Sequence, residues 1–86
     1  MTAPQPLHER LLDFEAARHA PYRKEALIRP TFACSAPRYY QQLMAIITPG
    51  PALAASLAYD PTTTARLLRL QEARRAARAA RTLTTD

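Results

Sequence analysis

The sequence predicts a small all-α protein: a helical bundle with a helix-turn-helix-like core, followed by a C-terminal Arg/Ala-rich helix. Its 86 residues allow one domain, and 48% of them are hydrophobic, which is enough for a compact core. Eight prolines and a single glycine exclude the tight Asn-Gly hairpins on which small β-proteins depend. Apolar residues recur instead at the three- and four-residue spacing of amphipathic helices.

The first helix is expected at about residues 7–19, because Leu7, Leu11 and Phe14 recur at helical spacing. Residues 1–6 lack this periodicity, and we expect them to form a disordered N-terminus.

A second helix begins at Pro21, since proline is well suited to the first turn of a helix. Pro30 costs about 3 kcal/mol in a regular helix interior, so the segment is expected to end or kink near Arg29. Phe32 then lies in the short connection that follows.

The third helix is predicted at about residues 36–48. Ser35 is a favourable N-cap, and Pro37 is tolerated in the first turn. The inward-facing stripe consists of Tyr39, Leu43, Ile46 and Ile47.

Two further helices complete the chain. Pro51 starts a short apolar piece of one or two turns, and Asp60 followed by Pro61 forms an N-cap and first-position pair for the last helix. No proline or glycine follows, so this basic helix is expected over 61–86, with a frayed end, after a helix-turn-helix-like core at 7–60.

Most of the net charge of +5 lies in the last helix. Residues 1–60 hold six basic and five acidic residues, a balance of +1, whereas 61–86 hold six arginines against Glu72 and Asp86, a balance of +4. An arginine-dense helix suits phosphate backbones. The same composition also suits a solvated tail or a helix that docks on an acidic protein surface.

The second helix, a short connection and the third helix have the proportions of a helix-turn-helix, whose second helix enters the DNA major groove. Tyr39 would be the buried anchor of this recognition helix. Arg38 can pair with guanine or a phosphate, Gln41 with adenine, and the Tyr40 hydroxyl with a phosphate. The alternative is that Tyr39 and Tyr40 straddle the edge of the core, with their hydroxyls reaching water.

Nine residues are therefore the candidate DNA contacts. Four lie on the third helix and five on the last. They are Arg38, Tyr40, Gln41, Met44, Arg66, Arg69, Arg74, Arg75 and Arg78.

The expected function is that of a non-enzymatic DNA-binding protein, a small transcription regulator with double-stranded DNA as its partner. Domains of this kind usually act as dimers, so a second copy or a host transcription protein is a further expected partner. The alternative function is an adaptor that binds an acidic protein, such as a subunit of the transcription machinery. We expect no cofactor and no small-molecule substrate.

Several other classes are excluded. No spacing among Cys34, His8, His19 and the carboxylates indicates a catalytic or metal site, and one cysteine cannot form an internal disulfide. The N-terminus has no signal-peptide pattern. The uncharged run 39–59 has the length of a membrane span, but a Pro-Gly-Pro sequence interrupts it. A cytoplasmic location is therefore expected.

One segment also resembles a known family. Its motif residues are Lys24-Glu25-Ala26, Phe32, Ser35, Arg38-Tyr39-Tyr40-Gln41, Leu43, Asp60-Pro61 and Arg66-Leu67 to Arg69. The order and spacing of these residues make the chain resemble a small actinobacterial and actinophage family of unknown function. The resemblance covers about residues 11–75. The resemblance implies an all-helical, helix-turn-helix-like protein and no established activity. Ala33 in place of glycine, Pro30 and Gln42 depart from the family pattern.

Overall fold

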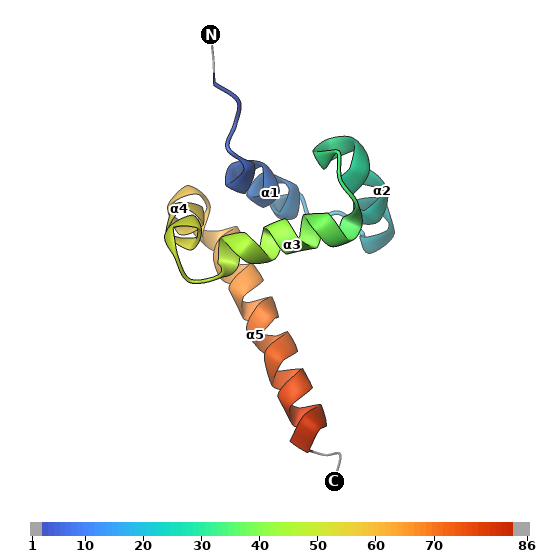
Figure 1. The fold of residues 1–86 in the computed structure, drawn as a ribbon, viewed down its shortest axis with the longest axis vertical. Helices are drawn as coiled ribbons and strands as arrows, with labels where there is room; N and C mark the ends of the chain where they lie inside the picture. Colours follow the sequence, from blue (N-terminus) through green and yellow to red (C-terminus); the bar gives the residue numbers. More distant parts are fainter. Residues whose placement is uncertain (1–2, 84–86) are drawn as a thin grey trace.

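A computed structural model describes residues 3–83, which form five α-helices and no strand (Figure 1). The all-α prediction is confirmed. Within this range no helix combines the length and hydrophobicity that crossing a lipid bilayer requires. The helices are α1 Leu7–Ala16, α2 Pro21–Phe32, α3 Ala36–Ile47, α4 Pro51–Tyr59 and α5 Pro61–Leu83.

The central element is α3, which packs against each of the other four helices. It runs beside α1, with α2 at one end and α4 at the other, while α5 leaves the compact part at a steep angle (Figure 1). Hydrophobic side chains from α1, α2, α3 and α5 meet in one core, because each helix turns its apolar stripe inward. This core contains Leu11, Leu12, Phe14, Ile28, Tyr39, Leu43, Ile46, Ile47 and Leu67.

The first helix is shorter than predicted, since α1 ends at Ala16 rather than near residue 19. Arg18 has a left-handed backbone with φ of 53°, and its N–H donates to the Glu15 carbonyl at 3.2 Å. A left-handed residue cannot continue a right-handed helix. No glycine marks this position, so the sequence contained no visible stop signal.

The predicted end near Arg29 is wrong, because α2 continues through Pro30 to Phe32. Pro30 lies in the last turn, where its missing N–H removes one hydrogen bond and little helix follows. Ala33 closes the helix: its backbone is left-handed, with φ of 56°, and its N–H donates to the Arg29 carbonyl at 2.8 Å. Phe32 is thus the last residue of α2 and not part of the connection, and its ring packs edge-on against Phe14.

Both predicted side-chain caps are present. The Ser35 Oγ accepts from the Arg38 N–H at 3.3 Å at the start of α3. The Asp60 Oδ1 accepts from the Thr63 N–H at 3.0 Å at the start of α5. Each cap satisfies one of the amide donors that a helix start leaves free. At its other end α3 stops at Ile47, one residue before the predicted end.

The short apolar segment forms a longer helix than predicted. α4 has nine residues, which is about two and a half turns. It is fixed against α5 because the Thr64 Oγ1 donates to the Ser56 carbonyl at 3.0 Å, and both side chains are fully buried.

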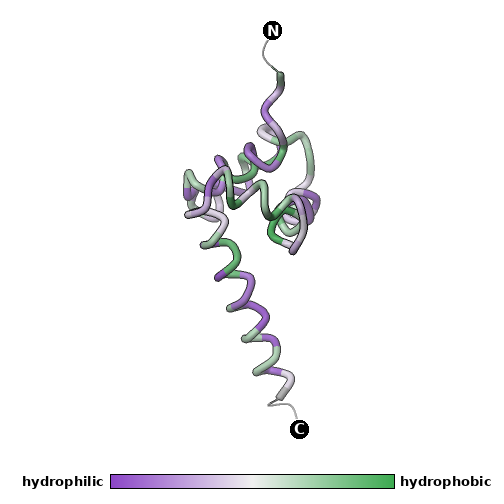
Figure 2. The backbone as a smooth tube through the Cα atoms, turned by 90° about the vertical axis from the view of Figure 1, so that its left-hand side faces the viewer, coloured by the Kyte–Doolittle hydropathy of each residue, from purple (hydrophilic) through white to green (hydrophobic). Residues whose placement is uncertain are grey.

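The last helix has two parts with different surroundings. Thr63, Thr64 and Leu67 are buried, so the beginning of α5 belongs to the core. Beyond Gln71 every residue whose exposure is described lies in solvent, and this part projects as a helix in which hydrophilic and weakly hydrophobic residues alternate (Figure 2). The projection gives the molecule its 60 Å long axis. Residues 84–86 of the predicted frayed end lie outside the described residues.

The predicted disordered N-terminus is described only from residue 3. Residues 3–6 are not helical, but the Gln5 Nε2 donates to the Asp13 Oδ2 at 2.8 Å. The Tyr59 hydroxyl donates to the other oxygen of Asp13 at 2.8 Å, which ties α4 to α1.

Candidate nucleic-acid interface

The outward face of α3 carries two of the predicted base-reading residues. Arg38 and Gln41 are exposed and lie one turn apart, and the Arg38 Nη1 approaches the Gln41 Oε1 to 3.5 Å. Tyr39, between them in sequence, points the other way and is fully buried. The helical period therefore presents a cationic and an amide side chain together on the surface while the aromatic residue anchors the helix.

Tyr39 is held in place by a buried carboxylate. Its hydroxyl donates to the Glu15 Oε1 at 2.6 Å, and the Lys24 Nζ lies 2.7 Å from the same oxygen. Burial, together with the Glu15 hydrogen bond, raises the pKa of Tyr39 well above its ordinary value, so the hydroxyl stays a proton donor. This cluster links α1, α2 and α3 and fixes the orientation of the outward face.

Tyr40 is placed differently from its α3 neighbours Arg38 and Gln41. It is half-buried, its ring packs edge-on against Tyr39 at 5.1 Å, and the Lys24 Nζ lies 5.3 Å from its centroid. The structure thus places Tyr40 at the boundary of the core, as in the alternative interpretation, whereas the Tyr39 hydroxyl is buried against Glu15 and does not reach water.

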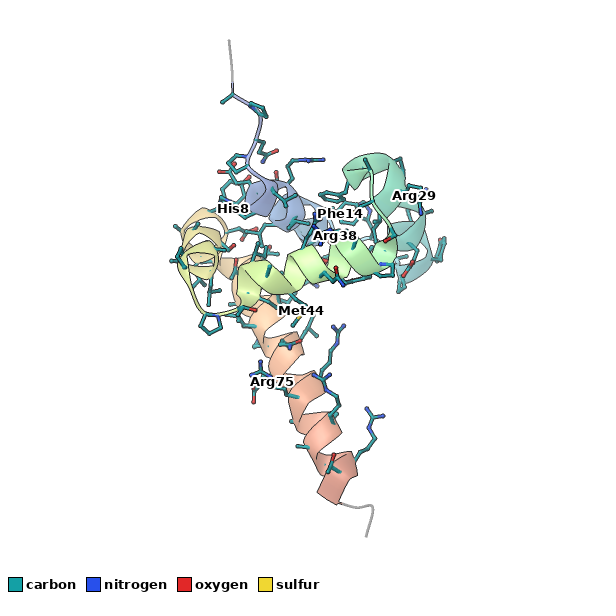
Figure 3. All side chains as sticks on the ribbon, in the orientation of Figure 1. His8, Phe14, Arg29, Arg38, Met44 and Arg75 are labelled. Carbon is teal, nitrogen blue, oxygen red and sulfur yellow. The ribbon has the colours of Figure 1, made fainter. Side chains whose placement is uncertain are left out.

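Met44 lies in the angle between α3 and α5 (Figure 3). It lines an open cleft of about 440 Å³ together with side chains of the projecting helix. The other lining residues are Gln71, Arg74, Ala77, Arg78 and Arg81. The structure therefore brings Met44 together with two of the predicted phosphate contacts, Arg74 and Arg78.

The remaining predicted arginines do not line this cleft. Arg66 is half-buried, and its Nη2 donates to the Glu15 carbonyl at 2.7 Å, so it fastens α5 to the end of α1. Arg69 and Arg75 are exposed on other faces of α5. At 3.6 residues per turn, Arg69 lies opposite Arg78, nine positions further on.

A second, more enclosed hollow adjoins the cleft and was not foreseen from the sequence. It measures about 170 Å³ and shares Met44, Gln71 and Arg74 with the cleft. The remaining lining residues are Glu15, Lys24, Tyr40, Leu43, Ile47, Leu67 and Leu70. The spacing of Leu67, Leu70 and Arg74 along one face of a helix was the signal available for it.

Among residues 3–83 no group of three or more histidine, cysteine or carboxylate side chains is placed to hold a metal ion. Neither a curated protein nor a solved structure matches the chain significantly. A family match, however, extends over residues 5–79, which is nearly the whole chain. The protein belongs to the family described as "Protein of unknown function (DUF3263)".

Proposed function

We propose that the protein is a non-enzymatic DNA-binding protein of the helix-turn-helix type. α2, the connection 33–35 and α3 form the reading unit, and α3 enters the major groove. The observation that carries the proposal is the split of α3 into a buried anchor, Tyr39, and an exposed pair, Arg38 and Gln41, in its N-terminal half. Recognition helices contact bases from this half.

The exposed pair has the chemistry for base recognition. Arginine pairs bidentately with the O6 and N7 atoms of guanine, and glutamine with the N6 and N7 atoms of adenine. Arg38 and Gln41 are one turn apart, so they would address neighbouring base pairs. Met44, one turn further, is 37% exposed and offers an apolar contact for a thymine methyl group.

The arginines of α5 would supply phosphate contacts. Arg74 and Arg78 project from the face of α5 that forms the cleft with α3, so a duplex seated against α3 can place its backbone beside them. Such contacts release counterions and do not depend on sequence. Arg66 is left out of this proposal because its guanidinium is already bonded to the Glu15 carbonyl.

The test separates base reading from phosphate contact. A preferred duplex is selected from a random pool, and its affinity is compared with that of a scrambled duplex for three proteins. Arg38→Ala with Gln41→Ala should lose most of the preference, about 1–3 kcal/mol for each good bidentate pair. Arg74→Ala with Arg78→Ala should weaken both duplexes alike and reduce the slope of log K against log salt by about two.

Unchanged discrimination in the α3 double variant would remove this helix as the reader. The matched control is Ala58→Ser, which alters an exposed position of α4, outside the proposed reading helix, without adding or removing charge. Far-UV circular dichroism verifies that each variant keeps the helical content of the parent.

A further inference from the structure

The angle between α3 and α5 contains a continuous groove, made of the enclosed hollow and the open cleft that adjoins it. We name it the α3–α5 groove. Met44, Gln71 and Arg74 belong to both parts and join them. Along α5 the groove extends from Leu67 to Arg81, a rise of about 21 Å or four helical turns.

The enclosed part of the groove is an apolar socket. Leu43, Ile47 and Leu67 form its floor, and each is 7% exposed. Leu70 at the rim is 48% exposed, so a large apolar side chain borders the opening of the hollow. At about 170 Å³ the socket is close to the cavity of roughly 150 Å³ that accommodates a benzene ring. It therefore has room for one leucine or phenylalanine side chain.

The open part of the groove is basic. Arg74, Arg78 and Arg81 follow one another at helical spacing and all line it. Glu72 is the one acidic residue between positions 61 and 83, and it does not line either part of the groove. Lys24 adds little to this charge, because its ammonium is paired with Glu15. The exposed charge of the groove is thus positive.

We propose that the α3–α5 groove binds an acidic amphipathic helix of a partner protein. One apolar side chain of that helix enters the socket, and carboxylates that flank its apolar stripe, one and two turns further along, reach Arg74 and Arg78. Helix-in-groove recognition uses apolar anchors at positions i, i+3, i+4 and i+7 of the bound helix, and charge complementarity selects the partner. A second copy of α5 is a poor occupant, because it would bring arginine against arginine.

Occupation of the groove would also affect DNA binding, and this consequence rests on the function proposed above. Arg74 and Arg78 belong to both surfaces, so an acidic helix and a DNA backbone compete for them. Docking of the acidic helix does not require DNA binding. The groove proposal and the DNA-binding proposal can therefore be refuted independently.

The experiment uses a fluorescent peptide of about four helical turns, with leucines at i, i+4 and i+7 and glutamates elsewhere. Its anisotropy is measured against the full chain at about 0.15 M salt. A shuffled peptide of the same composition, whose leucines are spread around the helix, measures the effect of charge alone. The amphipathic peptide should bind about tenfold or more tightly than the shuffled one, a difference of about 1.4 kcal/mol.

Variants locate the binding surface. Leu70→Glu and Arg74→Gln should each weaken binding about tenfold, while Arg69→Gln on the opposite face should change it less than twofold. Leu70 and both arginines are exposed at their side chains, and circular dichroism confirms that each variant folds. Equal binding of the two peptides, or equal loss in Arg69→Gln and Arg74→Gln, would overturn the proposal.

A final arm adds the peptide to the protein bound to labelled duplex. Release of the duplex by the amphipathic peptide but not by the shuffled one is the expected result. If the protein binds no duplex at all, the peptide titration still tests the groove, and only the proposed DNA-binding function is refuted. Duplex binding without any peptide binding overturns the groove proposal alone.

Discussion

At the scale of single residues, the polar contacts of the core converge on Glu15. Its carboxylate receives the Tyr39 hydroxyl and the Lys24 ammonium, and its backbone carbonyl receives the Arg66 guanidinium. Glu15 is only 6% exposed, and a buried charge is tolerated where such partners surround it. One residue of α1 therefore contacts α2, α3 and α5 and contributes to how these helices are oriented.

Tyr39→Phe removes one of these partners while keeping the ring. We expect the free energy of unfolding to fall by about 1–2 kcal/mol, because Glu15 loses a hydrogen bond that buried surroundings cannot replace. Urea unfolding measures the change. Tyr40→Phe is the control, since it keeps the ring contacts of Tyr40 to Tyr39 and Lys24, and it should be close to neutral. A larger loss of unfolding free energy in Tyr40→Phe than in Tyr39→Phe would contradict this account.

Ala33 is the second informative residue. Its left-handed backbone closes α2, and a residue with a Cβ is strained there by about 1 kcal/mol. Ala33→Gly removes the strain at the cost of greater freedom in the unfolded chain, and we expect a net gain of about 0.5 kcal/mol. Ala45→Gly, in the interior of α3, should instead lower stability by about 1 kcal/mol. Thermal unfolding of both variants tests the opposite signs.

At the scale of elements, the start of α5 depends on its cap. Hydrogen bonds from Thr63 lower the pKa of Asp60, chiefly the one from the backbone N–H. Asp60→Ala should reduce stability by about 1 kcal/mol near neutral pH, the usual cost of losing an N-cap.

The stability lost in Asp60→Ala should become smaller as the pH falls. A lowered folded pKa means that the charged cap stabilises the protein above the ordinary pKa of 3.8, and that this stabilisation disappears as the pH falls through the folded value. The gap between the parent and Asp60→Ala should therefore narrow in acid. Urea unfolding of both proteins across this range measures it, and a gap that widens toward acid would contradict the assignment.

The starts of the helices could be predicted from sequence, whereas several of their ends could not. Pro21, Ser35 and Asp60 mark starts through chemistry that acts within one turn. The ends of α1 and α2 depend on Arg18 and Ala33 in left-handed conformations that neither residue type favours. A backbone hydrogen bond closes each of these helix ends, and neither residue type marks such an end in the sequence.

In the candidate site, too, features set by local sequence pattern could be predicted, and features set by distant contacts could not. The exposure of Arg38 and Gln41 follows from helical periodicity around Tyr39 and was predicted correctly. The engagement of Arg66 depends on Glu15, 51 positions earlier, and the half-buried position of Tyr40 depends on its contacts with Tyr39 and with Lys24 of another helix. Contacts between distant segments leave no local pattern in the sequence, so these roles became visible only in the fold.

At the scale of the whole molecule, a compact core holds α3, and an arginine-rich helix projects from it (Figure 1). The projecting part, from residue 72 onward, lies in solvent as far as its exposure is described. A helix of about a dozen residues is only marginally stable when it packs against nothing. A ligand that covers this arm would stabilise it, and nucleic-acid phosphates suit its charge.

The most direct test of the DNA-binding account is the fluorescence anisotropy of a labelled random duplex of about three helical turns, titrated with the full chain across a range of salt. The account predicts binding at low salt, a steep linear fall of log K with log salt, and a much shallower slope when residues 72–86 are deleted. Circular dichroism of the truncated protein verifies that its remaining helices persist. Absence of binding even at the lowest salt would contradict the account.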